Sequence, residues 1–187
     1  MMARAFVVTI ALVVAAACSD ARDAEPELAA PATIKDIMDS MVEPSADFIF
    51  DSVAEIADEN GISQKAPRTD EEWTEVRRRA VQLLEAPNLL TMPGRKVARP
   101  GERSENPEVE LQPQQIQALV DRDPALFRTR ARALQDAAQA ALRGIDAQDP
   151  KALFDAAATL DKACESCHLQ YWYPNDKRAQ EAAKQNP

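Results

Sequence analysis

The chain has 187 residues, with 22 lysines and arginines, 31 aspartates and glutamates, one histidine and three cysteines. This length fits one folded domain, or two at most, and 45% hydrophobic residues are enough to form a buried core. Only four glycines and 5% aromatic residues argue against a β-barrel or β-sandwich. A formal charge of −9 argues against a nucleic-acid partner. The single histidine excludes a histidine-rich metal cluster, and it excludes bis-histidine ligation of one iron within the chain.

The first seventeen residues have the pattern of a signal peptide. Arg4 supplies a positive charge, and residues 5–17 form an uncharged run that is shorter than the roughly 20 residues of a membrane span. The run Ala-Ala-Ala-Cys that ends at Cys18 is similar to a bacterial lipobox, which predicts that Cys18 becomes a lipidated first residue. The alternatives are ordinary cleavage before Cys18, which leaves a free thiol, and an apolar core helix. Residues 18–31 are then a lipidated cysteine followed by a polar, flexible tether.

Apolar residues spaced three and four apart predict four amphipathic helices within a domain of residues 32–174. The first begins at Thr33, and Asn60-Gly61 supplies its stop. It is expected to kink or break near Pro44, because proline removes a backbone donor and clashes with the preceding turn. Its apolar stripe consists of Ile34, Ile37, Met38, Met41, Val42, Ile49, Val53 and Ile56.

The second helix opens at Thr69, which forms a capping box with Glu72, and it is expected to end at Pro87. Its stripe consists of Trp73, Val76, Ala80, Leu83 and Leu84. Residues 91–112 contain three prolines and two glycines and have no helical stripe. A segment of this length and composition is predicted to be a functional or mobile loop.

The third and fourth helices open with the same dipeptide, Asp-Pro at 123–124 and again at 149–150, with Asp as N-cap and Pro in the first turn. Residues 114–120 add a short helix before the third. Pro174 ends the fourth, and 175–187 is expected to be a polar tail. The stripes are Phe127, Ala131, Leu134, Ala138, Ala141 and Ile145, then Leu153, Ala157, Leu160, Cys164, Cys167 and Tyr171. Short links favour antiparallel neighbours, so the chain is predicted to be an all-α, up-down-up-down four-helix bundle.

The run Cys164-Glu165-Ser166-Cys167-His168 fits C-x-x-C-H, the attachment motif for c-type haem. Residues i, i+3 and i+4 share one helical face, so both thiols can reach the vinyl groups of one porphyrin while the imidazole binds its iron. A redox C-x-x-C normally opens a helix after a strand, a disulfide inside a helix has poor geometry, and zinc would need a second ligand pair. In an exported chain, haem attachment is the interpretation that this pattern favours.

A C-x-x-C-H motif on the last helix of an alanine-rich bundle resembles the class II c-type cytochromes, the cytochrome c prime family, over about residues 32–174. The resemblance implies one covalent haem c, thioethers at both cysteines of the motif and His168 as the proximal iron ligand. Many members continue the motif with Tyr and then Arg. Tyr171 matches this pattern, but Trp172 follows it in place of the arginine.

The sixth iron ligand separates two functions. His168 lies about 9 Å from the end of its helix, and the same depth in the antiparallel first helix falls at Met38. Met41 is the next candidate and Met92 a third, and core packing is the alternative for all of them. The resemblance also points to a methionine early in the first helix. Two loop cations could meet haem propionates or stay solvated, namely Arg95 and Arg99.

With a methionine ligand, we expect a protein that is not an enzyme and carries single electrons for redox partners of a respiratory chain. It would act on the periplasmic side, anchored to the membrane through Cys18, or soluble in the periplasm if Cys18 carries no lipid. With no sixth ligand, a five-coordinate iron would bind nitric oxide or carbon monoxide, as cytochrome c prime proteins do. Both readings exclude nucleic acid as a partner and allow a homodimer.

Overall fold

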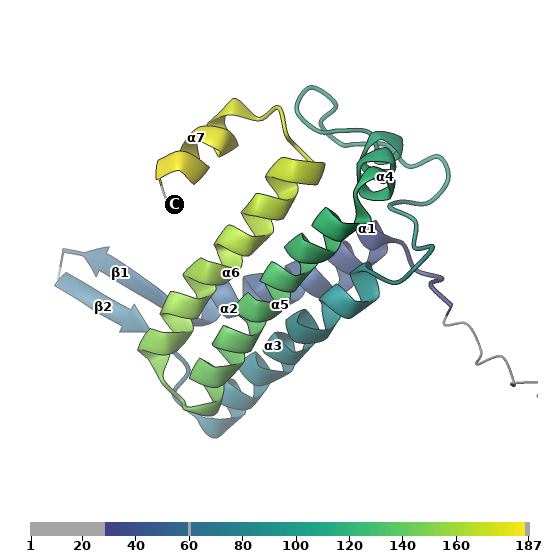
Figure 1. The fold of residues 1–187 in the computed structure, drawn as a ribbon. Helices are drawn as coiled ribbons and strands as arrows, with labels where there is room; N and C mark the ends of the chain where they lie inside the picture. The colour runs from purple at the N-terminus through teal and green to yellow at the C-terminus, as the bar shows by residue number, and fades with distance from the viewer. Residues whose placement is uncertain (1–28, 60, 186–187) are drawn as a thin grey trace, which may run out of the picture.

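A computed structural model of the chain describes residues 29–59 and 61–185, and within these ranges the protein is mostly helical (Figure 1). This agrees with the all-α prediction. The predicted signal peptide, residues 1–17, and the predicted lipidation site, Cys18, lie outside the described residues. Within the described ranges, no helix has both the length and the apolar character that crossing a membrane requires.

The first helical segment consists of three consecutive pieces, α1 (Ile34–Ile37), the π-helical turn η1 (Met38–Val42) and α2 (Glu43–Ser52). A capping box opens it, since Thr33 Oγ1 accepts from the Asp36 amide at 3.0 Å and the Asp36 carboxylate accepts from the Thr33 amide at 3.0 Å. The predicted interruption near Pro44 takes the form of the π turn. Its wider winding directly precedes Pro44, whose ring would clash with a carbonyl group one turn earlier in a regular α-helix.

A β-hairpin follows α2, which corrects the prediction that the first helix continues to Asn60-Gly61. Strand β1 (Ala54–Asp58) pairs antiparallel with β2 (Gly61–Lys65), and the hairpin projects away from the helices (Figure 1). Asp58 pairs with Gly61, so the glycine of the predicted helix stop is instead the first residue of β2, where its φ of 120° suits glycine. Asn60 lies outside the described residues. Ile56, which the predicted apolar stripe included, is 46% exposed, so it does not belong to the core.

The next helix, α3 (Asp70–Leu90), begins at the predicted capping box, with the Glu72 amide 3.2 Å from Thr69 Oγ1. The prediction that Pro87 ends this helix is wrong. Pro87 is buried inside α3, and the helix continues for three more residues to Leu90. Ala86 and Leu90 are also buried, so packing against the core offsets the roughly 3 kcal/mol that a proline costs inside a helix.

Three helices follow the loop, α4 (Pro113–Arg122), α5 (Pro124–Asp146) and α6 (Pro150–Tyr171). Both Asp-Pro predictions are confirmed. The Asp123 carboxylate accepts from the Leu126 amide at 2.9 Å, and the Asp149 carboxylate accepts from the Ala152 amide at 3.1 Å. Helix α4 confirms the short helix that residues 114–120 predicted.

The C-terminal segment, for which the sequence predicted a polar tail, contains a further helix. Helix α7 (Lys177–Gln185) is opened by the Asp176 carboxylate, which accepts from the backbone amides of Arg178 and Ala179 at 2.9 and 3.1 Å. None of its residues is buried. The segment carries no apolar stripe that would have predicted the helix, which instead depends on its alanine, lysine and glutamine residues and on this cap.

The long helices enclose one core. Helix α5 packs against α6 and α3, α3 packs against α2, and α2 packs against α6. Neighbours run in opposite directions, since Arg77 near the start of α3 pairs with Asp146 at the end of α5 at 2.7 Å. The Phe127 ring near the start of α5 likewise meets the Tyr171 ring at the end of α6, with centroids 5.4 Å apart. All six residues of the stripe predicted for α5 are buried.

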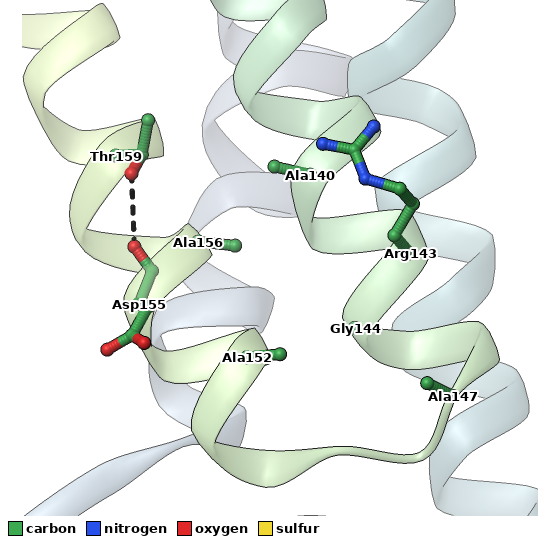
Figure 2. Close-up of a pocket in the computed structure, with 8 residues that line it drawn as sticks. All are labelled: Ala140, Arg143, Gly144, Ala147, Ala152, Asp155, Ala156 and Thr159. Carbon is green, nitrogen blue, oxygen red and sulfur yellow. Dashed lines mark hydrogen bonds between the residues drawn. The ribbon is translucent and has the colours of Figure 1, made fainter.

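Small residues allow α5 and α6 to approach closely near their connecting turn. A Cβ atom added to Gly144 would lie 2.9 Å from the Leu153 backbone nitrogen and 3.1 Å from the Ala152 carbonyl carbon. Figure 2 shows Gly144 in a shallow hollow between the two helices that alanines line on both sides. This hollow lies at the opposite end of α6 from the C-x-x-C-H motif.

We expect Gly144→Ala to lower the free energy of unfolding. Overpacking against backbone atoms costs about 1–3 kcal/mol, which exceeds the roughly 1 kcal/mol that alanine gains over glycine in a helix. Urea denaturation would measure the difference, with Gln139→Ala on the exposed side of α5 as the control. An unchanged midpoint for Gly144→Ala would show that the two helices are further apart in solution.

Candidate haem-attachment site

The C-x-x-C-H residues lie in the last two turns of α6, before its end at Tyr171. Cys164, Cys167 and His168 are each half-buried, and both cysteines pack against the core as free thiols. Buried Leu160 and Tyr171 flank them on the same helix. The two thiols are therefore on the side of α6 that faces the other helices, and the half-buried imidazole of His168 lies beside them on the same helix.

Burial raises the pKa of both thiols, to about 12 at Cys164 and to about 11 at Cys167, where the charge of Arg130 partly opposes the effect. At neutral pH both thiols are therefore protonated. A redox C-x-x-C motif needs the opposite, a thiol whose pKa is lowered so that the thiolate forms. This environment favours a structural or covalently linked role for the two cysteines over disulfide exchange.

His168 is surrounded by aromatic rings and one carboxylate. The Trp172 and Tyr173 rings lie 5.0 and 5.7 Å from the imidazole, centroid to centroid. Tyr173 Oη is 3.3 Å from His168 Nδ1 and 2.7 Å from Glu165 Oε2. Burial lowers the pKa of His168, with Glu165 opposing it, so the imidazole is neutral at pH 7. Among the hydrogen bonds of the described residues none uses Nε2, which leaves that nitrogen available as a ligand.

Two buried polar atoms near Cys167 have no hydrogen-bond partner in the described part of the chain, Arg130 Nε and Tyr171 Oη. Arg130 lies one helical turn after Phe127, whose ring contacts Tyr171, so it occupies the face of α5 that meets α6. Buried polar groups are almost always paired, and each exception calls for an explanation. The propionate groups of a haem bound beside Cys167 would supply such partners, so these residues fit a haem.

The predicted methionines occupy two different places. Met38 and Met41 are half-buried in the π turn η1. Among the described helices, α1 and η1 make at most marginal contact with α6, and α2 makes a limited one. Met92 lies in the loop after α3, and its sulfur accepts a hydrogen bond from Arg95 Nη2 at 3.1 Å.

The loop of residues 91–112 covers the start of α1. The Ile34 amide donates to the Lys96 carbonyl at 2.8 Å, and the Lys35 amide donates to the Val97 carbonyl at 2.9 Å. These bonds satisfy amides that a helix N-terminus leaves unpaired. The segment thus has a defined structural role, which its lack of helical periodicity did not reveal.

Arg95 holds this loop in place. Its side chain is 7% exposed, its Nε donates to the Leu89 carbonyl at 2.5 Å, and its Nη1 donates to the Ala32 carbonyl. Arg99 forms an ion pair with Asp36. Both arginines that the sequence offered as propionate partners therefore have protein partners around the start of α1.

We expect Arg95→Ala to lower the free energy of unfolding by about 2–3 kcal/mol, because it leaves the Leu89 and Ala32 carbonyls without a buried donor. Thermal and urea denaturation would measure the loss. Lys96→Ala is the matched control, since its side chain is exposed and its backbone makes the same loop contact. Normal stability with lost haem would instead assign Arg95 to a haem propionate.

No protein-family model, curated protein or solved structure matches this chain. Among the described residues, no group of three or more His, Cys, Asp or Glu side chains is arranged to hold a metal ion. The resemblance to class II c-type cytochromes thus stays an expectation from the motif.

Proposed function

We propose that this protein is a c-type cytochrome of the class II kind, with one haem c attached through Cys164 and Cys167 and with His168 as an axial ligand. One observation carries the proposal: the two protonated thiols of the C-x-x-C-H motif pack against the core, and the half-buried imidazole beside them has no hydrogen bond to Nε2 among the described residues. When bound, the haem would supply a one-electron couple. The protein's own part is to hold that group covalently and to orient the imidazole.

The packing of the helices supports an antiparallel four-helix bundle as the scaffold. The contacts α2–α3, α3–α5, α5–α6 and α6–α2 form a closed ring, with α1 and η1 extending α2. Such bundles bind cofactors between facing helices. The attachment helix α6 lies next to α2 in this ring, so the segment that contains η1 is the natural source of a second ligand.

Met38 is the methionine that we propose as the second axial ligand. Ile34 and Phe127 line one cavity, and the Phe127 ring contacts Tyr171, so Ile34 lies at about the level of Tyr171. Counting inward along the two antiparallel helices from that level brings His168 to the depth of Ile37 and Met38. Because a π turn holds more residues than an α turn, Met41 points in a clearly different direction from Met38. The Met92 sulfur already accepts a hydrogen bond from Arg95.

A His/Met couple has no open iron position, so the proposed function is electron transfer and not catalysis. Trp172 contacts the His168 ring and is 41% exposed, which supports an electron-transfer face at this end of α6. With the predicted export signal and Cys18 anchor, the protein would serve respiratory redox partners on the periplasmic side. The limited packing of η1 against α6 favours one second candidate, a five-coordinate iron that binds nitric oxide or carbon monoxide.

The test is to produce the full-length chain in a host that exports proteins and attaches c-type haem. After denaturation and electrophoresis, the band should keep a haem stain and carry the added mass of one haem. The ferric spectrum should be low-spin, with the weak long-wavelength band of a methionine–iron bond. An unstained band would overturn the proposal, and a stained, high-spin protein that changes on adding carbon monoxide would select the five-coordinate candidate.

A further inference from the structure

Three side chains around the motif form a hydrogen-bonded chain, Glu165–Tyr173–His168. Glu165 lies one helical turn before His168, and Tyr173 follows the end of α6. The backbone holds Tyr173 in this position, because its amide and that of Trp172 both donate to the His168 carbonyl, at 3.0 and 2.7 Å. Because these bonds fix the Tyr173 backbone, its hydroxyl is held close to both the imidazole and the carboxylate.

The donors and acceptors in this chain determine where the protons lie. A carboxylate only accepts hydrogen bonds, so at 2.7 Å the Tyr173 hydroxyl donates to Glu165 Oε2. The Tyr173 oxygen is then an acceptor toward His168, and Nδ1 at 3.3 Å is the donor. A neutral imidazole with its proton on Nδ1 has its lone pair on Nε2. This is the tautomer that can bind a metal through Nε2.

We propose that Glu165 and Tyr173 are positioning residues that fix the His168 tautomer and make Nε2 a stronger electron donor, which lowers the reduction potential of the haem. This inference rests on the proposed function. A metal-bound histidine commonly donates its other N–H to a carboxylate or carbonyl group, which orients the ring and raises its basicity. Here a tyrosine hydroxyl connects the imidazole to the carboxylate. A more basic imidazole stabilises ferric iron more than ferrous iron.

The edge-to-face contact of Trp172 with His168, at an interplanar angle of 88°, limits rotation of the imidazole from a second side. The ring orientation is thus defined by one hydrogen bond and by aromatic contacts with Trp172 and Tyr173. The motif alone does not reveal this arrangement, because Tyr173 reaches His168 only through the turn that ends α6.

Tyr173→Phe and Glu165→Gln in the haem-loaded, full-length protein test the inference. Tyr173→Phe keeps the ring but removes the hydroxyl, so the ferric-to-ferrous ratio at a fixed potential should fall about tenfold, which is about 59 mV for a one-electron couple. Glu165→Gln should shift the potential in the same direction by less, since the amide oxygen still accepts from Tyr173. The ferric EPR spectrum, which reports axial donor strength, should change in both variants.

Asp155→Asn is the matched control, because it removes the same charge from an exposed position on α6 where, within the described ranges, the Asp155 carboxylate pairs with Lys151 alone. A stained wild type with both variants at the control's potential and EPR spectrum would overturn the inference and leave the cytochrome intact. An unstained wild type would reject the proposed function itself. Should Tyr173→Phe yield no holoprotein, Glu165→Gln decides, because it preserves every ring contact.

Discussion

Replacing both Cys164 and Cys167 with serine is expected to abolish covalent haem attachment. The only other cysteine of the chain is Cys18, which is remote in sequence from the motif. The exported double variant should therefore lose all haem stain after denaturation and the mass of one haem. Each single variant keeps one thiol and should retain a reduced, singly linked haem. Staining of denatured protein and intact mass spectrometry measure both effects.

Two controls show whether the loss is specific. Ser166→Ala removes a hydroxyl inside the motif that only donates to the Ala163 carbonyl, so staining should be unchanged. Cys18→Ser should keep the haem and lose the predicted membrane association. Full staining of the double cysteine variant would contradict thioether attachment at these positions.

Replacing Met38 with leucine is expected to convert the ferric protein almost completely from low spin to high spin. The reduction potential should fall, because a methionine ligand raises it, and carbon monoxide should bind rapidly to the ferrous form. Leucine has nearly the volume of methionine, so the variant should fold with a stability loss below about 1.5 kcal/mol. Optical spectra with and without carbon monoxide measure the conversion.

Met41→Leu and Met92→Leu are the matched controls, and both should remain low-spin. A high-spin Met41→Leu protein beside a low-spin Met38→Leu protein would transfer the ligand to Met41. If all three variants keep the wild-type spectrum, methionine ligation is wrong, and the iron is either five-coordinate or bound by another residue.

The local features of the fold could be predicted because a few adjacent residues create them. The capping box at Thr69 and the Asp-Pro starts of α5 and α6 involve side chains and amides within one helical turn, and all three are confirmed. The spacing in C-x-x-C-H likewise places its side chains on one helical face wherever the helix packs. An apolar stripe predicted which residues are buried where the segment does form a helix and that helix packs against the core, as in α5.

The errors arose where tertiary contacts outweigh local preference. Pro87 remains inside α3, because burial of that helix end compensates for a lost hydrogen bond. Strands β1 and β2 form a hairpin although Val53 and Ile56 keep a helical spacing, because the pairing of the two strands outweighs that local pattern. Arg95 belongs to the loop that covers α1, and its partners come from segments up to 63 residues away.

The sequence by itself determined the helical class, most of the helix starts and the chemistry offered by Cys164, Cys167 and His168, because these depend on residues within a turn of one another. Only the tertiary structure decided which side chains surround that chemistry. Tyr173 reaches His168 and Glu165 through the chain reversal after α6, and Arg130 faces Cys167 because α5 packs antiparallel to α6. Contacts of this kind are set by how the helices pack, which residue spacing along one helix does not determine.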